Sequence, residues 1–295
     1  MENINDCPVC GGINNILYLK CKDFSISKEQ FNIVKCNTCS FLFTSPRPAE
    51  NQIGKYYDSN VYISHHANKG GLIPLIYRTI RNQQFINKTE LIKRYFTNEI
   101  SILDIGCGTG NFLQYCSTIK WHGVGVEPDS DARITAKNNN VEVYNLDYLK
   151  QTEKKFDVIT MWHVLEHVHS LDERMLQLQK LINPNGIIIV AVPNCNSYDA
   201  FYYKEYWAAF DLPRHLYHFT KKTIAKLFLK HNFNLVHMEP MKYDSFYVSI
   251  KSEEYKNKNT ILNLINGVIK GLASNIKASG NKEYSSLIYV FKKEI

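Results

Sequence analysis

The stretch ILDIGCGTGNF, residues 102–112, decides the fold of this chain. An apolar run ends in glycines at alternate positions, Gly106, Gly108 and Gly110, which is typical of a strand that turns sharply into a helix beside a ligand. Dehydrogenases that bind nucleotides use a similar loop, so the glycines alone are a weak signal. Asp104 stands two residues before the first glycine. Its carboxylate would repel a pyrophosphate and favours a ligand that carries a cationic amino-acid group.

Two further acidic residues follow the glycine loop. Glu127 lies in VGVEP, residues 124–128, about 20 residues after the loop, where a carboxylate can accept hydrogen bonds from two ribose hydroxyls. Asp147 lies in NLDY, residues 145–148, where its oxygen could accept a hydrogen bond from an adenine amino group. Each acid follows an expected strand, at the end where open α/β sheets bind ligands.

Apolar, β-branched segments alternate with helical ones from residue 100 onward, which predicts an α/β fold with a parallel sheet covered on both faces. A last strand, expected at 286–292, would lie antiparallel at or near the sheet edge. The preceding strands are expected at 101–105, 123–127, 141–145, 156–162, 186–192 and around 235–238, with helices at about 111–120, 129–139 and 171–182.

The loop and the two acids together resemble motifs I to III of class I S-adenosylmethionine-dependent methyltransferases. FDVITMWHVLEHV, residues 156–168, resembles the fourth-strand motif of the subgroup that includes the ubiquinone-type O-methyltransferases. This resemblance covers roughly residues 95–240 and implies a Rossmann-like sheet of seven strands, the last antiparallel. It also implies that S-adenosylmethionine is held by Asp104, Gly106, Cys107, Gly108, Gly110, Glu127, Pro128, Asp147 and Tyr148, with Met161 and Trp162 near its methionine end.

Four of the eight cysteines form two Cys-x-x-Cys pairs, Cys7 with Cys10 and Cys36 with Cys39, separated by 25 residues. Two such knuckles can complete a tetrahedral sulfur site that suits a structural Zn²⁺, and the intervening segment leaves room for a β-hairpin. A segment this short buries little core, so a metal ion would supply its folding energy. A redox dithiol or unpaired thiols remain the alternatives.

We expect three parts in the chain: a zinc-ribbon-like domain at 1–45, a helical linker or lid at 46–98, and the α/β domain at 99–295. A helical insertion is expected within the last part, near 251–280. The linker carries Tyr56, Tyr57, Tyr62 and His65. These side chains could close over the cofactor or equally could pack between the two domains.

His163, Glu166 and His167 also spell His-x-x-Glu-His, the pattern of one class of zinc metallopeptidase. Two histidines four residues apart on a helix could bind zinc and leave the glutamate as base. This stretch begins inside an expected strand of the cofactor-binding unit, which argues against that interpretation.

The segment FDLPRHLYHFT, residues 210–220, lies in the connection that overhangs the acceptor side of the cofactor in this fold. Together with the cysteine-rich start of the chain, it resembles the deoxysugar C-methyltransferases, in which a Glu-His pair at this point serves the chemistry. His215 matches the histidine, but Arg214 stands in place of the glutamate. We expect His215 to act as the base, with Arg214 or Tyr217 anchoring the acceptor. The alternative is that the histidines only satisfy loop hydrogen bonds.

Composition and charge do not identify the molecule that accepts the methyl group. Hydrophobic residues make up 44% of the chain and charged residues 21%, as in a soluble globular protein, and no apolar run is long enough to span a membrane. The net charge of +7 is scattered, so we expect no nucleic-acid partner. We expect a cytoplasmic enzyme of unknown oligomeric state that methylates a small molecule, a sugar or a natural-product or polysaccharide precursor. The alternatives are O-methylation of a quinone-like or phenolic acceptor, an RNA-binding methyltransferase, or a non-catalytic protein that binds S-adenosylmethionine.

Overall fold

The computed structural model describes residues 1–57, 72–257 and 259–294. The chain divides into two compact units, each considered by itself below. Unit 1 comprises Met1–Tyr57, His163–Met175 and Val190–Glu294, and unit 2 comprises chiefly Asp58–Trp162 and Leu176–Ile189. The division of the chain at residues 45 and 98 stays a prediction.

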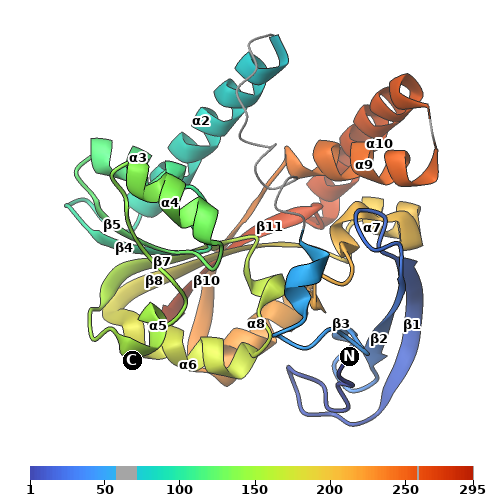
Figure 1. The fold of residues 1–295 in the computed structure, drawn as a ribbon, viewed down its shortest axis with the longest axis horizontal. Coiled ribbons are helices and arrows are strands. Elements are labelled where there is room, and N and C mark those ends of the chain that lie inside the picture. The colour runs from blue at the N-terminus through green and yellow to red at the C-terminus, as the bar shows by residue number, and fades with distance from the viewer. Residues whose placement is uncertain (58–71, 258, 295) are drawn as a thin grey trace. The chain divides into compact units, whose positions relative to one another are not determined.

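A seven-stranded mixed sheet confirms the predicted fold class, with the strand order β10-β11-β8-β7-β4-β5-β6 (Figure 1). Strands β4, β5, β6 and β7 pair in parallel, whereas β10 and β11 pair antiparallel. The expected last strand lies second from the edge, next to β10. The strands are β4 (Ser101–Ile105), β5 (His122–Val126), β6 (Glu142–Tyr144), β7 (Phe156–Trp162), β8 (Ile182–Pro193), β10 (Phe233–Pro240) and β11 (Ser286–Lys293).

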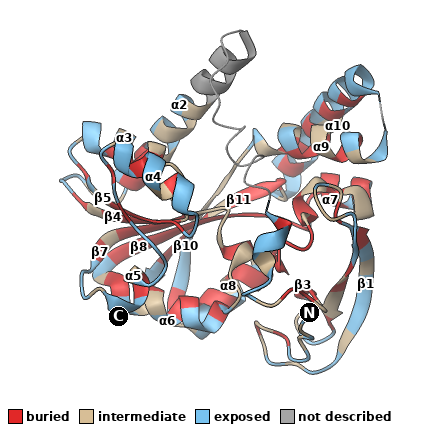
Figure 2. Cartoon of the chain, in the orientation of Figure 1, coloured by how far each residue is buried: buried red, intermediate tan, exposed pale blue. Residues whose placement is uncertain are grey.

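Burial of the strands explains why they form a parallel sheet. All residues from Ile187 to Val192 of β8 are fully buried, as expected for a β-branched strand with cover on both faces (Figure 2). Helix α3 (Asn111–Thr118) packs closely on β5, because a Cβ atom at Gly123 would lie 2.7 Å from the Leu113 side chain. The helices α4 (Ser130–Asn138), α5 (Tyr148–Gln151) and α6 (Leu171–Leu181) follow in the same alternating order.

A second sheet in unit 1 has four strands in the order β1-β2-β3-β9. Strands β1 (Asn15–Lys22) and β2 (Gln30–Cys36) form the hairpin for which the cysteine spacing leaves room, and β3 (Leu42–Thr44) pairs with β2. The fourth strand, β9 (Tyr217–His218), comes from the distant segment expected to carry the base. The N-terminal sheet is therefore completed by that segment.

The remaining helices of unit 1 are α7 (Tyr198–Tyr203), α8 (Lys221–Lys230), α9 (Asp244–Lys256) and α10 (Thr260–Asn281). Helix α10 and the end of α9 fall within the helical insertion expected near 251–280, whereas the start of α9, residues 244–250, was not expected from the sequence. Their backbones are in close contact, because a Cβ atom at Gly267 would lie 2.5 Å from the Cα of Ile250. In the linker, η1 (Ile53–Tyr56) is a single 3-10 turn and α2 (Leu72–Lys93) is a long helix. Among the described helices, none is both long and apolar enough to cross a membrane.

Candidate functional site

The glycine loop of unit 2 turns the chain from β4 into α3. Gly106, Gly108 and Gly110 have φ angles of 74°, 55° and 76°, in the left-handed region that favours glycine. A Cβ atom at Gly110 would lie 2.9 Å from Val141, so crowding also requires glycine there. A Cβ atom at Gly108 would meet nothing within 4 Å. The backbone at Gly108 is therefore open to a ligand.

Asp104 lies at the carboxyl end of β4, almost completely buried. The hydroxyl of Thr160 on β7 donates a hydrogen bond of 2.6 Å to its Oδ1. Burial raises the pKa of Asp104 to about 6, although the bond from Thr160 and the charge of Lys88 oppose the shift. This carboxylate therefore titrates close to neutral pH.

Glu127 follows β5 and accepts two backbone hydrogen bonds, from the N–H of Gly108 at 2.9 Å and of Asp129 at 3.0 Å. Burial raises its pKa, while these two bonds lower it. The neighbouring Pro128 offers its carbonyl to Arg133. Because an ionised carboxylate has about four acceptor positions, Glu127 can hold the loop and still accept from a ribose.

Asp147 precedes α5 and accepts a hydrogen bond of 3.0 Å from the side chain of Asn145. The ring of Tyr148 stacks on that of Tyr144, with centroids 4.3 Å apart and an interplanar angle of 7°. Tyr144 ends β6, and Tyr148 and the exposed Asp147 follow it, where the sequence places the adenine side of the cofactor. Their contact with the cofactor stays a prediction.

Lys88 of α2 is a residue that the sequence analysis missed. Its ammonium lies 3.9 Å from the ring centroid of Trp162, and its charge acts on Asp104. The Trp162 ring makes an edge contact with Phe112, whereas Met161 is completely buried in β7. Lys88 therefore places a positive charge near Asp104. At that position an ammonium group could pair with the carboxylate of the cofactor's methionine moiety.

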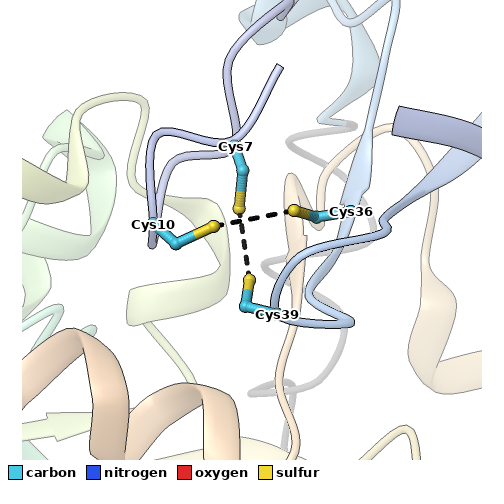
Figure 3. Close-up of side chains that lie close together, drawn as sticks. All are labelled: Cys7, Cys10, Cys36 and Cys39. Atoms are coloured by element: carbon cyan, nitrogen blue, oxygen red, sulfur yellow. Dashed lines mark hydrogen bonds between the residues drawn. The ribbon is translucent and has the colours of Figure 1, made fainter. Parts of the chain in front are cut away.

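The four paired cysteines of unit 1 converge on one point (Figure 3). The sulfur of Cys7 lies 3.5 Å from that of Cys39, and the sulfur of Cys10 lies 3.6 Å from that of Cys36. The four ligand atoms all lie within 4.8 Å of one another. These separations fit a tetrahedral S₄ site, for which Zn²⁺ is the suited ion.

The two cysteine knuckles have the same backbone geometry. Gly11 and Ser40 donate 2.8 Å hydrogen bonds to the carbonyls of Cys7 and Cys36, four residues earlier, with φ angles of 71° and 63°. A Cβ atom at Gly12 would lie 2.8 Å from the hydroxyl of Thr38. Each knuckle therefore presents its thiols from a rigid turn, as a structural metal site requires.

His215 lies in the segment before β9 and is 9% exposed. Its Nδ1 lies 2.8 Å from the carbonyl of Ala209, to which it can donate, and its Nε2 lies 4.0 Å from Asp211. With Nδ1 carrying the proton, Nε2 holds the lone pair that a base needs. The ring of His167 packs against it edge-on, with centroids 4.6 Å apart.

Arg214 is engaged within the protein. Its Nε and Nη2 donate to both oxygens of Asp211, Nη2 also approaches Asp23 at 3.2 Å, and Nη1 donates to the carbonyl of Tyr56. Asp211 and Asp23 hold the guanidinium charged. Arg214 therefore stabilises the loop through these contacts. They do not support its expected role in anchoring the acceptor, which stays a prediction.

Tyr217 is likewise engaged. Its hydroxyl accepts from Arg47 at 2.8 Å and donates to the carbonyl of His169 at 2.8 Å. The residue is 3% exposed and belongs to β9. Its side chain therefore links β9 by hydrogen bonds to the segments around Arg47 and His169. Its role in anchoring an acceptor stays a prediction.

Glu166, His167 and His215 form a second group that could hold a divalent cation. One carboxylate oxygen and two ring nitrogens lie within 4.8 Å of one another. Both oxygens of Glu166 are buried without a hydrogen-bond partner in the described part of the chain. Burial lowers the pKa of His167 to about 4, with a further contribution from nearby His215. This group is not the metallopeptidase arrangement, because Leu165–His167 is a single 3-10 turn and His163 lies outside it.

His163 lies between two acids, with Nδ1 3.4 Å from Glu166 and Nε2 3.0 Å from Asp244 of α9. Burial opposes its charge, but the two carboxylates raise its pKa to about 10. The protonated ring lowers the pKa of Glu166 against the effect of burial. His163 therefore acts as a charged bridge between the chain after β7 and α9.

The aromatic residues of the linker have separate environments. Tyr56 is buried and donates to Glu29 at 2.7 Å, so its ring packs in the core of unit 1. Tyr57 is 41% exposed, and its hydroxyl lies 3.0 Å from Nδ1 of His167. Tyr62 and His65 lie outside the described residues.

Comparison with known sequences identifies the family of this chain. A model described as a methyltransferase domain matches residues 77–238. The ubiquinone biosynthesis O-methyltransferase of Rickettsia bellii (strain OSU 85-389) is 32% identical over 142 residues, which cover 43% of this chain and 56% of that protein. The protein of the same name from Pelagibacter ubique (strain HTCC1062) is 31% identical over 105 residues, or 32% and 42% of the two chains. The chain therefore matches about half the length of these curated relatives.

Solved structures share the fold at low sequence identity. The magnesium protoporphyrin IX methyltransferase of Synechocystis PCC 6803, solved with bound SAH, has a TM-score of 0.53 at 13% identity and covers 81% of this chain and 97% of its own. The 4+2 cyclase SpnF has a TM-score of 0.50 at 15% identity, with coverage of 71% and 80%. These similarities support the fold alone, since the second protein is named for a different reaction.

Proposed function

This chain belongs to the family of methyltransferase domains, and from that premise we propose that it transfers the methyl group of S-adenosylmethionine to a small-molecule acceptor. The products are the methylated acceptor and S-adenosylhomocysteine. The observation that carries the proposal is the series Asp104, Glu127 and Asp147. The three acids lie at or just after the carboxyl ends of the neighbouring strands β4, β5 and β6, with the open glycine loop beside the first.

Each part of the cofactor has a group in unit 2 with matching chemistry. Asp104 carries the negative charge for the ammonium of the methionine moiety, and Lys88 the positive charge for its carboxylate. Glu127 supplies acceptor positions for the ribose hydroxyls, and Asp147 one for the adenine amino group. Gly108 lets the backbone approach the bound molecule.

We assign the acceptor base to His215. The Ala209 carbonyl orients the ring so that Nε2 can take a proton, and Asp211 is placed to stabilise the charged ring that forms. When bound, S-adenosylmethionine would supply an activated methyl group, and His215 would take the proton of the acceptor oxygen or carbon that receives it.

Oxygen in a phenolic or quinone-like acceptor is the better supported of the two acceptor classes, because the curated relatives are named ubiquinone biosynthesis O-methyltransferases. A sugar or a polysaccharide precursor rests on the resemblance in layout alone. Arg214 replaces the glutamate of that family's Glu-His pair and is paired with Asp211 and Asp23.

The four-cysteine site is proposed to hold a structural Zn²⁺. Sulfur distances, matched knuckles and the small core of the N-terminal sheet all support a closed site without a position for substrate. When bound, the ion would fix Cys7, Cys10, Cys36 and Cys39 and so the two turns that carry them.

The function is tested by calorimetry with S-adenosylmethionine, followed by an assay of S-adenosylhomocysteine release. We expect micromolar binding and turnover with catechol-like or quinol-like acceptors, and none with nucleotide-linked sugars. An Asp104→Asn variant should lose binding, while an Asp131→Asn variant on the outer surface of α4 should keep it. Absence of cofactor binding at millimolar concentration would overturn the proposal, and turnover only with sugars would reverse the choice of acceptor.

A further inference from the structure

Glu166, His167 and His215 of unit 1 form a compact group of potential metal ligands. The first two belong to the 3-10 turn η2 (Leu165–His167), and His215 comes from the segment before β9. One carboxylate oxygen and two ring nitrogens lie within 4.8 Å of one another. Two imidazoles and one carboxylate are a frequent ligand set for Zn²⁺ and for other divalent ions of the first transition series. Only small side-chain movements separate these atoms from the distances at which they share one ion.

Backbone hydrogen bonds hold the two segments of this group together. The N–H of Leu216 donates to the carbonyl of Glu166 at 2.8 Å. In the opposite direction, Nδ1 of His167 lies 3.0 Å from the carbonyl of Arg214. The two bonds lie on either side of His215 in the sequence. The three side chains are therefore positioned before any ion binds.

Both histidines present one ring nitrogen with a lone pair. Nδ1 of His215 lies 2.8 Å from the carbonyl of Ala209, and Nδ1 of His167 faces the carbonyl of Arg214. A carbonyl oxygen only accepts, so each Nδ1 carries the proton and each Nε2 keeps its lone pair. The hydroxyl of Tyr57, 3.0 Å from the same nitrogen of His167, can share that proton as a second acceptor. Histidines that bind a metal ion almost always donate their other N–H in this way.

Glu166 has unfilled acceptor positions although it is fully buried. Neither carboxylate oxygen has a hydrogen-bond partner among the residues that the structure describes. His163 approaches Oε1 only to 3.4 Å. Buried polar groups are normally paired, and an unpaired carboxylate costs free energy. A cation between Glu166 and the two rings would offset this cost.

The ion pairs at this group contain more carboxylates than cations. Two cationic side chains, His163 and Arg214, face four carboxylates. With His167 and His215 neutral, four against two leaves an excess of two negative charges, which favours a divalent cation. The four carboxylates are Glu166 and Asp244 beside His163, and Asp211 and Asp23 beside Arg214.

We propose that Glu166, His167 and His215 bind one divalent ion of the Zn²⁺ or Co²⁺ type, and that the bound ion keeps His215 from acting as a base. The lone pair of Nε2 cannot coordinate an ion and accept a proton at the same time. The metal site stands on the geometry above, whereas its effect on turnover rests on the proposed function. Mg²⁺ is a poor occupant, because it prefers oxygen ligands in an octahedral arrangement. Three protein ligands leave open coordination positions, so this ion exchanges with solvent more readily than one held by four thiolates.

Co²⁺ titration of the full chain tests the site without cofactor or acceptor. The protein is first saturated with Zn²⁺ and dialysed, so that the cysteines keep their ion and the exchangeable one is removed. We expect calorimetry to show about one further Co²⁺ per chain, with visible absorption that lacks the sulfur-to-cobalt transition of thiolate ligands. Mg²⁺ under the same conditions should give no heat of binding.

Glu166→Gln removes the negative charge at nearly constant shape, and His167→Gln removes one nitrogen ligand. Each should weaken Co²⁺ binding by about 100-fold or more, since loss of a ligand exceeds the effect of losing an outer partner. The matched control is His237→Gln, because His237 lies 3.0 Å from Glu239 in a histidine–carboxylate pair outside both metal-ligating groups of the described chain. It should bind Co²⁺ as the unchanged protein does. Thermal unfolding identifies any variant that fails to fold, and if Glu166→Gln does, His167→Gln decides.

No further Co²⁺ in the unchanged protein, binding only with thiolate absorption, or full binding by folded His167→Gln would overturn the site. Release of S-adenosylhomocysteine should fall in proportion to the Co²⁺ bound. Unchanged or increased release at saturation would refute the effect on the base. Metal binding is measured alone, so absence of methyl transfer in the dialysed protein would count against the proposed function and not against the site.

Discussion

The hydroxyl of Thr44 donates a buried hydrogen bond of 2.9 Å to the carbonyl of His215. Thr44 ends β3, the strand that follows the second cysteine knuckle, and His215 is the proposed base. The same hydroxyl lies 3.3 Å from Nε2 of His218. The N-terminal sheet thereby fixes the backbone of the segment that carries the proposed chemistry.

Thr44→Val should weaken both stability and turnover. The substitution keeps the shape but removes the donor, so the carbonyl of His215 loses a buried partner and unfolding becomes easier by about 1–2 kcal/mol. Denaturant titration measures the first effect and steady-state kinetics the second. Thr118→Val, at an exposed hydroxyl on α3, is the control. If the free energy of unfolding and the turnover of Thr44→Val were both unchanged, this hydrogen bond would not position His215.

His215→Ala should lower kcat by about 10²–10⁴-fold and leave cofactor affinity unchanged, because the variant removes only the proton acceptor. Calorimetry and single-turnover assays separate the two quantities. His122→Ala, at a ring exposed on the surface of unit 2, should behave as the unchanged protein. Full turnover in His215→Ala would leave the loop histidines with a structural role alone.

Affinity for S-adenosylmethionine should decline as the pH falls through about 6. Burial raises the pKa of Asp104 to about 6, so the carboxylate that attracts the ammonium is lost below that pH. The decline approaches about tenfold per pH unit in the acid range. Asp104→Asn should bind weakly with no such dependence. An affinity that is constant between about pH 5 and pH 7 would contradict this role for Asp104.

The ion pairs of His163 should make stability decrease at high pH. The folded pKa, about 10, lies above the usual value of 6.5, so the stabilisation is complete below about pH 6.5 and is lost as the pH rises through about 10. The side chain is 35% exposed, and after allowance for solvent screening the loss is about 2 kcal/mol. Denaturation curves across this range measure it. His163→Gln should remove this contribution to the pH dependence of the free energy of unfolding. The same pH dependence in both proteins would contradict the assignment.

Cys36→Ser should remove the metal ion and destabilise the N-terminal sheet by several kcal/mol, because metal binding and folding are coupled. Elemental analysis should find about one zinc per chain in the unchanged protein. Cys21→Ser changes a buried cysteine of the same sheet outside the four-thiol site, so it should retain zinc. Full zinc content in Cys36→Ser would contradict the four-cysteine assignment.

The elements that the sequence predicted well depend on local patterns. Nearby backbone and the alternation of strands with helices along the chain determine three features. They are the glycine loop, the acids after β5 and β6, and the run of buried residues in β8. The proximity of Glu166 to His215 and the place of Lys88 depend on contacts between distant segments, for which one sequence carries no periodic signal. The start of helix α9 was missed because its apolar positions are few and its packing partner is a row of small residues on α10.

Strand β9 has a consequence for how the protein is made. A ribosome releases β1, β2 and β3 long before it synthesises Tyr217 and His218, so β3 keeps an unpaired edge through most of translation. The four paired cysteines are already synthesised at that stage and, under the proposed assignment, could then bind Zn²⁺. Metal binding and closure of the sheet would in that case be separate events in time. The nascent chain between them, with the edge of β3 still open, would be the form most exposed to pairing with the wrong strand.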